Sequence, residues 1–358
     1  MAKFMDVFED VTKHGTKIPS HLYLENGLYP IVDQGQSQIA GYTNKEQGLF
    51  TDVPAIIFGD HTRIIKYVDT PCFLGADGVK LLKAKVTTAN YKFLYYALCN
   101  ADIPNTGYNR HFKWLKEVEI PEYSMEEQNS IVSQLEKIDA LISLRKQQLL
   151  KLDELVKSRF IELFGDPESN PYGHPIKKLS DIASYWNGLT YKPEDVQDQG
   201  TIVLRSSNIQ NSQLDFEDTV RVACRIREKQ YVQNNDILMC SRNGSAKLVG
   251  KVALIKNIAE PMSFGAFMMI IRSDYYWYLM TYFQMDAFRN QIKTGATTTI
   301  NQITGNMLNQ VTLPVPDLSV VSQFATFVEQ TGKSKFEIQQ SLEKLEMLKK
   351  SLMQKYFG

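Results

Sequence analysis

Two stretches of the chain carry the heptad pattern of hydrophobic and polar positions that is typical of long, paired α-helices. In the first, from Glu126 onward, stripe positions recur in alternating steps of four and three residues. Ser124 followed by Glu127 predicts a capping box at its start, and Gly165 with Pro167 predicts its end. At ~1.5 Å per residue, the predicted helix is roughly 57–60 Å long. The stripe consists of Ile131, Leu135, Ile138, Ile142, Arg145, Leu149, Leu152, Val156, Arg159 and Leu163.

The second stretch, from Ser319 to about Tyr356, keeps part of this stripe and ends the chain. Its apolar positions thin out around residues 331–333, which predicts looser or bent pairing there. One amphipathic helix of this length cannot bury its stripe on a small domain, so the simplest partner is the other helix. We therefore expect the two helices to pack as an antiparallel coiled coil. The retained stripe positions are Phe324, Val328, Ile338, Leu342, Leu345, Leu352 and Tyr356.

The two helical stretches are copies of one another. When the chain is shifted by 193 positions, residues 114–165 fall on residues 307–358 without a gap. Thirteen of these 52 positions are identical, where unrelated segments would share roughly three or four. The chain therefore contains a tandem duplication. Identical pairs include Leu115/Leu308, Pro121/Pro314, Glu136/Glu329, Lys151/Lys344 and Phe164/Phe357.

A weaker repeat in the same order precedes each helix. The apolar strand at 55–58 aligns with the one at 237–240, and a basic, polar turn follows each. Aromatic runs at 91–96 and 275–282 are predicted to be core, and a Thr-Gly pair recurs at 106–107 and 294–295. We therefore predict an α+β protein with two globular domains of twisted, mostly antiparallel sheets with helices. The predicted boundaries are domain 1 at 1–123, helix 1 at 124–165, domain 2 at 166–317 and helix 2 at 318–358.

Composition limits the function without deciding it. The 358 residues carry 40 basic and 40 acidic side chains, which argues mildly against a dedicated nucleic-acid binder. That total hides local structure, because residues 221–229 hold four positive charges and one negative charge. No signal peptide or membrane-spanning segment is evident, so we expect a cytoplasmic protein. The scattered cysteines suggest reduced thiols rather than a zinc or disulfide framework. They are Cys72, Cys99, Cys224 and Cys240.

Motifs for catalysis are sparse. No phosphate-binding loop and no metal-binding histidine spacing is found. Asp60 and His61 are adjacent, but neighbours in sequence do not usually face one another, and no nucleophile is placed beside them. Three hypotheses remain: a non-catalytic protein that holds two different DNA-binding surfaces a fixed distance apart, a coiled-coil scaffold that links two protein-binding modules, and a nuclease or deaminase built around Asp60 and His61. The first is the main interpretation.

The chain resembles the specificity (S) subunit of Type I restriction-modification systems over its whole length. Residues 113–132, with Trp114, Pro121 and Gln128, resemble that family's entry into its conserved helical region, and residues 160–167 resemble its exit. Residues 29–36, 58–63 and 73–79 resemble one class of its target-recognition domains. Residues 235–239, followed by a turn of small residues, resemble another class.

This resemblance implies two target-recognition domains, each specific for one half of a bipartite site on double-stranded DNA. The helices would set the spacer between the half-sites and dock two methyltransferase subunits. Two restriction subunits would join in some complexes. The chain itself would be non-catalytic and bind no cofactor, because S-adenosylmethionine and ATP are expected on the partner subunits.

Residues with paired donors and acceptors, placed in loops, are the candidates for base contacts. In domain 1 these are Gln34, Gln36, His61, Arg63, Tyr108, Asn109, Arg110 and His111. In domain 2 they are Arg205, Ser207, Asn208, Arg242, Asn243, Lys247, Asn301 and Gln302. A further set of cations is better suited to phosphates, which position a protein without specifying sequence. These are Lys113, Arg221, Arg225, Arg227 and Lys229.

Overall fold

The computed structural model describes residues 1–75, 78–293 and 301–358, and the chain divides into two compact units. Unit 1 comprises residues 1–147 and 339–358, and unit 2 comprises residues 148–338. Residues 76–77 of the motif at 73–79 and the Thr-Gly pair at 294–295 lie outside the described residues. Among the described residues, no helix is long and apolar enough to cross a membrane.

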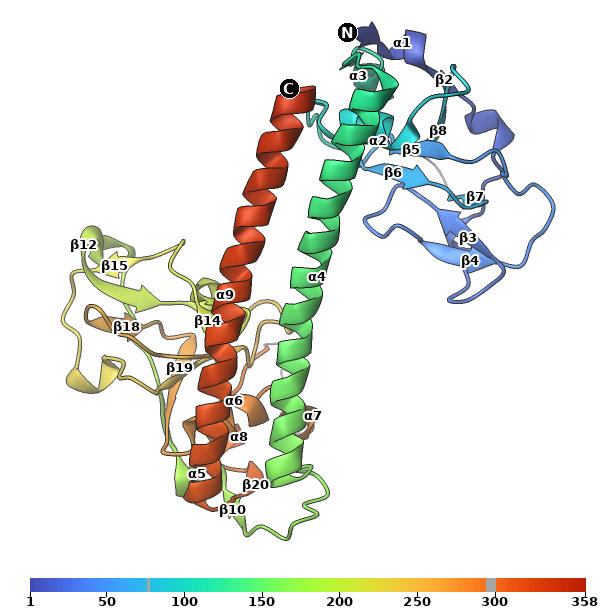
Figure 1. The fold of residues 1–358 in the computed structure, drawn as a ribbon. Helices are drawn as coiled ribbons and strands as arrows, with labels where there is room; N and C mark the ends of the chain where they lie inside the picture. Colours follow the sequence, from blue (N-terminus) through green and yellow to red (C-terminus); the bar gives the residue numbers. More distant parts are fainter. Residues whose placement is uncertain (76–77, 294–300) are drawn as a thin grey trace. The chain divides into compact units, whose positions relative to one another are not determined.

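Two long helices confirm the heptad prediction (Figure 1). Helix α4 covers Met125–Phe164 and helix α9 covers Leu318–Phe357, 40 residues each. The predicted capping box is present at the start of α4: the Ser124 backbone N–H donates to Glu127 Oε2 at 2.8 Å, and the Glu127 N–H donates to Ser124 Oγ at 3.3 Å. Gly165 ends α4 in the left-handed region with φ +76°, which a glycine adopts without strain.

In unit 1, the first part of α4 lies beside the last part of α9 and runs in the opposite direction. Lys349 Nζ lies 2.5 Å from Asp139 Oδ1, and Lys146 Nζ lies 3.0 Å from Glu346 Oε1. The residue number therefore rises along α4 as it falls along α9. This is the antiparallel pairing that the stripe predicted.

In unit 2, the remaining part of α4 pairs with the first part of α9. Here too the two helices run in opposite directions. Lys335 Nζ lies 2.5 Å from Asp153 Oδ1. Further along, the rings of Phe160 and Phe324 meet edge to face, with their centroids 5.7 Å apart. Phe160 is fully buried in the core of this unit, together with Phe164 and Tyr278.

The thinned stripe of α9 does not break the helix. Thr331 is buried, and its Oγ1 donates to the backbone oxygen of Phe327 one turn earlier at 2.9 Å. Lys335, the next stripe position, forms the ion pair with Asp153. Polar residues on the stripe thus satisfy their hydrogen-bonding groups within or between the helices, and α9 continues without interruption.

The domain that precedes α4 contains three sheets in its described residues. Their strand orders are β2-β8-β5-β6, β4-β3-β7 and β1-β9, and all neighbours are antiparallel except β3 and β7. Helix α2 contributes its apolar face to the core that β5 also lines. The elements are β1 Ala2–Lys3, α1 Phe4–Val7, β2 Phe8–Asp10, β3 Tyr29–Val32, β4 Gly41–Thr43, β5 Ala55–Gly59, β6 Ile65–Val68, β7 Phe73–Leu74, β8 Val79–Ala84, α2 Tyr91–Cys99, α3 Phe112–Leu115 and β9 Glu119–Ile120.

The domain between α4 and α9 repeats this arrangement. Its described strands form the orders β11-β19-β16-β17, β15-β12-β18 and β10-β20, with β12 and β18 parallel, and a short hairpin β13-β14 is added. The elements are β10 Ile176–Lys178, α5 Leu179–Ile182, β11 Ser184–Asn187, β12 Val196–Leu204, β13 Ile209–Gln210, β14 Gln213–Leu214, β15 Arg221–Val222, β16 Ile237–Cys240, β17 Val252–Leu254, β18 Met262–Phe264, β19 Met268–Arg272, α6 Tyr276–Tyr282, α7 Asp286–Lys293, α8 Gly305–Leu308 and β20 Thr312–Pro314.

The common strand order shows that both domains share one topology, down to the parallel pair in the smaller sheet. The side chains that face each core also shift the sequence alignment of the central strands by one residue. Ile56 and Phe58 of β5 face the core that contains α2, whereas Ile57 faces the opposite core. In β16 the residues that face the helices are Ile237 and Met239. Ile56 therefore corresponds to Ile237, and not Ala55 as the alignment predicted.

Both aromatic runs contribute to the cores, as predicted. Tyr91, Phe93 and Tyr96 are buried in unit 1, and Tyr278 and Tyr282 are buried in unit 2. Burial raises the pKa of the Tyr278 hydroxyl, which donates to the backbone oxygen of Pro314 at 2.6 Å. The aromatic rings therefore act as core side chains rather than as stacking surfaces.

Substitution of Phe160 by alanine tests this packing. We expect Phe160→Ala to lower the free energy of unfolding by about 3–5 kcal/mol, because it leaves a cavity among three aromatic rings. Leu155→Ala, at an exposed position of the same helix, should change it by less than about 0.5 kcal/mol. Chemical denaturation measures both. Equal effects of the two substitutions would contradict the packing described for α4.

Candidate nucleic-acid interface

In domain 1, three loops meet beyond the end of the central strand β5. The Gln34 side chain accepts a hydrogen bond from the His61 backbone N–H at 3.1 Å, which ties the loop after β3 to the β5–β6 turn. The His61 ring stacks on Tyr108 with centroids 4.6 Å apart and planes 8° from parallel. His61 Nδ1 lies 3.2 Å from the backbone oxygen of Asn109. The fold thus brings together Gln34, His61, Tyr108 and Asn109.

Asp60 and His111 hold these loops in place. The buried Asp60 carboxylate accepts from the Phe112 backbone N–H at 2.7 Å, and the Asp60 backbone oxygen accepts from the His111 N–H at 2.8 Å. His111 is itself fully buried, and its Nε2 lies 3.3 Å from Thr106 Oγ1. These contacts point the Asp60 carboxylate at the backbone rather than at His61.

The other candidates of domain 1 differ in their surroundings. Arg63 donates from Nη1 to the backbone oxygen of Ile103 at 2.9 Å, so its guanidinium braces a neighbouring loop. Gln36, Arg110 and Lys113 are exposed, and Lys113 Nζ lies 4.9 Å from the centre of the Trp114 ring. The exposed residues are accessible to a ligand, whereas Arg63 has an internal structural contact.

In domain 2, a cavity of about 1040 Å³ opens beyond the corresponding strand, β16. The turn after β16 contributes Arg242 and Asn243 to its wall, and the β18–β19 turn contributes Phe267. The Arg242 guanidinium carbon lies 5.2 Å from the centre of the Phe267 ring. Five candidates line this one cavity, namely Arg205, Ser207, Arg242, Asn243 and Asn301.

Polar contacts organise the cavity wall. Asn243 Nδ2 donates to Ser206 Oγ at 3.2 Å, and Asn301 Nδ2 donates to the backbone oxygen of Gly244 at 3.2 Å. Arg205 forms an ion pair with Asp218 at 2.7 Å, which partly neutralises its charge. Gln302 forms a backbone bridge to Arg242 at the edge of the cavity.

Asn208 is not among the residues that line the cavity. Its fully buried side chain accepts from the Arg205 backbone N–H at 2.8 Å and donates to the backbone oxygens of Asp215 and Asp218, both at 2.9 Å. All three contacts are with main-chain atoms of the segment that carries Arg205 and Ser207. Asn208 therefore shapes this segment.

The cationic candidates at 221–229 and Lys247 do not line the cavity. Arg221 forms two hydrogen bonds to Glu260, at 2.6 and 2.7 Å, which raise the pKa of the guanidinium and lower the pKa of the Glu260 carboxyl below its ordinary value. The remaining cations are exposed and form no ion pair within the described part of the chain. They are Arg225, Arg227, Lys229 and Lys247.

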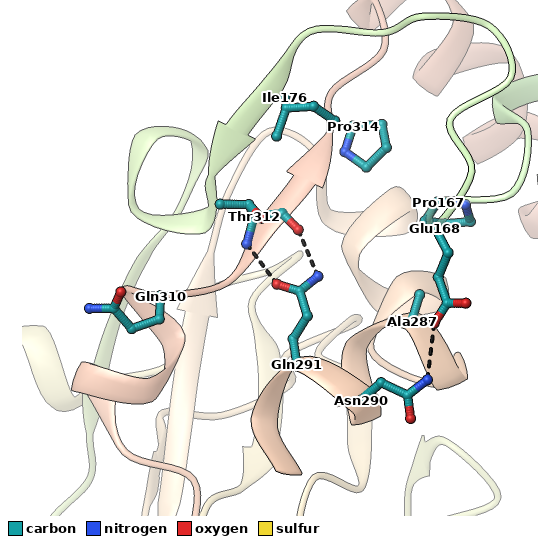
Figure 2. Close-up of a pocket in the computed structure, with 9 residues that line it drawn as sticks. All are labelled: Pro167, Glu168, Ile176, Ala287, Asn290, Gln291, Gln310, Thr312 and Pro314. Carbon is teal, nitrogen blue, oxygen red and sulfur yellow. Dashed lines mark hydrogen bonds between the residues drawn. The ribbon is translucent and has the colours of Figure 1, made fainter. Parts of the chain in front are cut away.

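A second cavity, of about 560 Å³, lies beside the β10–β20 pair and contains none of the candidates (Figure 2). There the Gln291 amide donates to the Thr312 backbone oxygen at 2.8 Å and accepts from the Thr312 N–H at 2.9 Å. The side chain thus occupies the hydrogen-bonding edge of β20. In residues 1–75, 78–293 and 301–358, no three His, Cys, Asp or Glu side chains are grouped to hold a metal ion.

The wall of the domain 2 cavity contains two residues, Phe267 and Asp218, that the sequence pattern did not indicate. Phe267 lies in the apolar run 262–271, where it resembles one more core side chain, yet the residue is 59% exposed. The available signal was its position just after Gly265-Ala266, a turn of small residues between two strands.

The structural role of Asn208 gives a testable difference. We expect Asn208→Ala to lower the free energy of unfolding by about 2 kcal/mol, because it leaves buried main-chain groups without partners. The exposed Gln213→Ala is the control and should have little effect. Thermal or chemical unfolding measures both. If Asn208→Ala were as stable as the control, the positioning role would be wrong.

Comparisons with known proteins bear on what this interface binds. The family model of the Type I restriction modification DNA specificity domain matches residues 2–154 and 173–348. The chain is similar to the StySPI specificity subunit of Salmonella potsdam and the EcoKI specificity subunit of Escherichia coli, at 27% identity over 183 residues in each case. The matched region covers 48% of this chain and 39% of each relative.

The fold is also similar to solved structures. A Type I restriction-modification S subunit from M. genitalium aligns over 99% of this chain and 95% of its own, with a TM-score of 0.61 at 17% identity. A structure from work on complex assembly and conformational transition of the type I R-M system aligns over the same shares, with a TM-score of 0.56 at 16% identity. Since the family model matches both halves of the chain, this protein belongs to the Type I restriction-modification DNA specificity family.

Proposed function

We propose that this chain is a non-catalytic specificity subunit that directs a DNA adenine methyltransferase complex to a bipartite site on double-stranded DNA. Each globular domain contacts one half-site, and the complex acts in the cytoplasm. The observation that carries this proposal is the placement of different polar side chains beyond the same central strand in two domains of one topology. One frame that carries different contact residues in its two copies is what a protein with two different targets of one kind would have.

Within this proposal, the loops beyond β5 and β16 enter the major groove, where side chains with paired donors and acceptors distinguish the bases. The exposed cations of 225–229, with Lys113 and Lys247, contact phosphates. Arg63, His111 and Asn208 support the loops from inside the domains, and Arg221 is held by Glu260. The near-zero net charge is compatible with this, because the cations are placed locally.

The long helices provide the surface for the partner subunits and set the spacer between the half-sites. Several large apolar side chains on their outer faces are exposed, including Leu144 at 54%, Leu150 at 64% and Phe336 at 63%. Large exposed apolar side chains on a helix are available for contact with another protein. We propose that two methyltransferase subunits dock there and supply S-adenosylmethionine, and that restriction subunits with ATP join them where they are present.

Methylation mapping tests the proposal. We expect a cell that expresses this chain with its methyltransferase partner to carry methylated adenines in a motif of two specific half-sites separated by an unspecific gap. Single-molecule sequencing of the genomic DNA reports both half-sites and the gap. The control is the methyltransferase expressed without this chain, which should leave the motif unmodified. No bipartite motif, or the same motif in the control, would contradict the proposal.

A further inference from the structure

Each domain places one side chain at an equivalent position just beyond its central strand. Because Ile56 corresponds to Ile237, counting onward along both strands aligns His61 with Arg242. Backbone hydrogen bonds support this alignment: the Asp60 N–H donates to Gly78 at 2.6 Å, and the Ser241 N–H donates to Phe267 at 2.9 Å. The residues directly before His61 and Arg242 are therefore held in the same way.

Both side chains lie against an exposed aromatic ring. His61 stacks on Tyr108, whose side chain is 87% exposed, and Arg242 lies over Phe267, which is 59% exposed. The loop that supplies the ring differs between the two domains. Gly78 occupies the position equivalent to Phe267, and a Cβ there would lie 2.6 Å from His61 Cδ2. Domain 1 thus has no room for a ring at that position and supplies Tyr108 from the loop before α3 instead.

Two other cations near these sites, Arg205 and Arg63, are engaged by the protein. Arg205 is paired with Asp218, and Arg63 donates to the backbone of Ile103. By contrast, Arg242 is exposed and forms no ion pair within the residues that the structure describes. A planar side chain that rests on a ring loses less conformational freedom when it binds, so the pairing prepares it for one contact geometry.

We propose that His61 and Arg242 are specificity-determining residues, each contacting one base of its half-site in the major groove while the stacked ring holds it in position. This rests on the proposed function. Arg242 presents a fork of donors, which matches the O6 and N7 acceptors of guanine. Domain 2 therefore requires a guanine at one position of its half-site.

His61 has the opposite preference. Its Nδ1 faces the Asn109 backbone oxygen at 3.2 Å, and since that oxygen can only accept, we assign to the bound ring the neutral tautomer with its proton on Nδ1. Nε2 of the neutral ring is then an acceptor. In the major groove an acceptor pairs with an amino group, which adenine and cytosine present. Domain 1 therefore requires one of these two bases at the position that His61 contacts.

The test uses the complex of the full chain with its methyltransferase partner and duplexes that carry every single-base change of the mapped motif. We expect Arg242→Ala to reduce discrimination about 10- to 100-fold at one guanine of one half-site and nowhere else. Arg242→Lys should behave similarly, because a point charge cannot replace the fork. His61→Ala should relax one adenine or cytosine of the other half-site.

Phe267 is assigned as a positioning residue, and a conservative variant separates this role from general damage. Phe267→Ala should weaken discrimination at the same guanine as Arg242→Ala, whereas Phe267→Tyr should restore it. Lys177→Ala, an exposed cation on β10, is the matched control and should leave every position unchanged. Circular dichroism melting curves verify that each variant is folded.

The outcomes separate this inference from the proposed function. If the unsubstituted complex did not prefer the mapped motif over a scrambled duplex, the proposed function would fail, and this inference with it. If that preference were present, an equal loss of affinity for all duplexes would reassign Arg242 to a phosphate contact. Relaxation at a base other than guanine, or no change, would also overturn the assignment, and the proposed function would stand.

Discussion

The apolar stripe on each 40-residue helix forces the two repeats to pack against each other. A stripe of that length cannot be buried by the small domain next to it, so the long helix of one repeat pairs with the long helix of the other. Unit 1 consequently contains the end of the chain: Met353 of α9 lies in the same core as Leu135 of α4. Unit 2 likewise joins Phe160 of α4 to Phe324 of α9. Each of these two cores therefore needs residues from both long helices.

Polar residues in this pairing constrain its register. Asp139, Lys146 and Asp153 are seven residues apart on α4 and alternate in sign, and each meets an opposite charge on α9. Exposed ion pairs contribute little stability individually. A helix displaced by one heptad would, however, bring like charges together. The charges therefore favour one alignment, while the buried apolar residues provide most of the stability.

Much of the fold could be predicted because it depends on periodicity. The heptads predicted both helices to within a residue or two, and the repeat predicted a shared topology. The interface was less accessible to sequence reasoning. Asn208 and Asn243 are both asparagines in polar turns, yet only Asn208 is fully buried against main-chain groups. Tertiary contacts made by residues distant in sequence determine this difference. The same applies to Phe267, whose apolar neighbours conceal its exposure.

If two domains of one design each specify half of one DNA site, exchanging one domain for a copy of the other should change the target of the complex. The shift of 193 positions that relates the two repeats aligns Ser124 with Asp317. Residues 175–317 can therefore be replaced by a second copy of residues 1–124, which leaves both long helices intact. Methylation mapping of cells that carry this chain and its methyltransferase partner gives the readout. We expect a motif whose two halves are inverted copies of the domain 1 half-site. An active chain that still modified the original, asymmetric motif would contradict it.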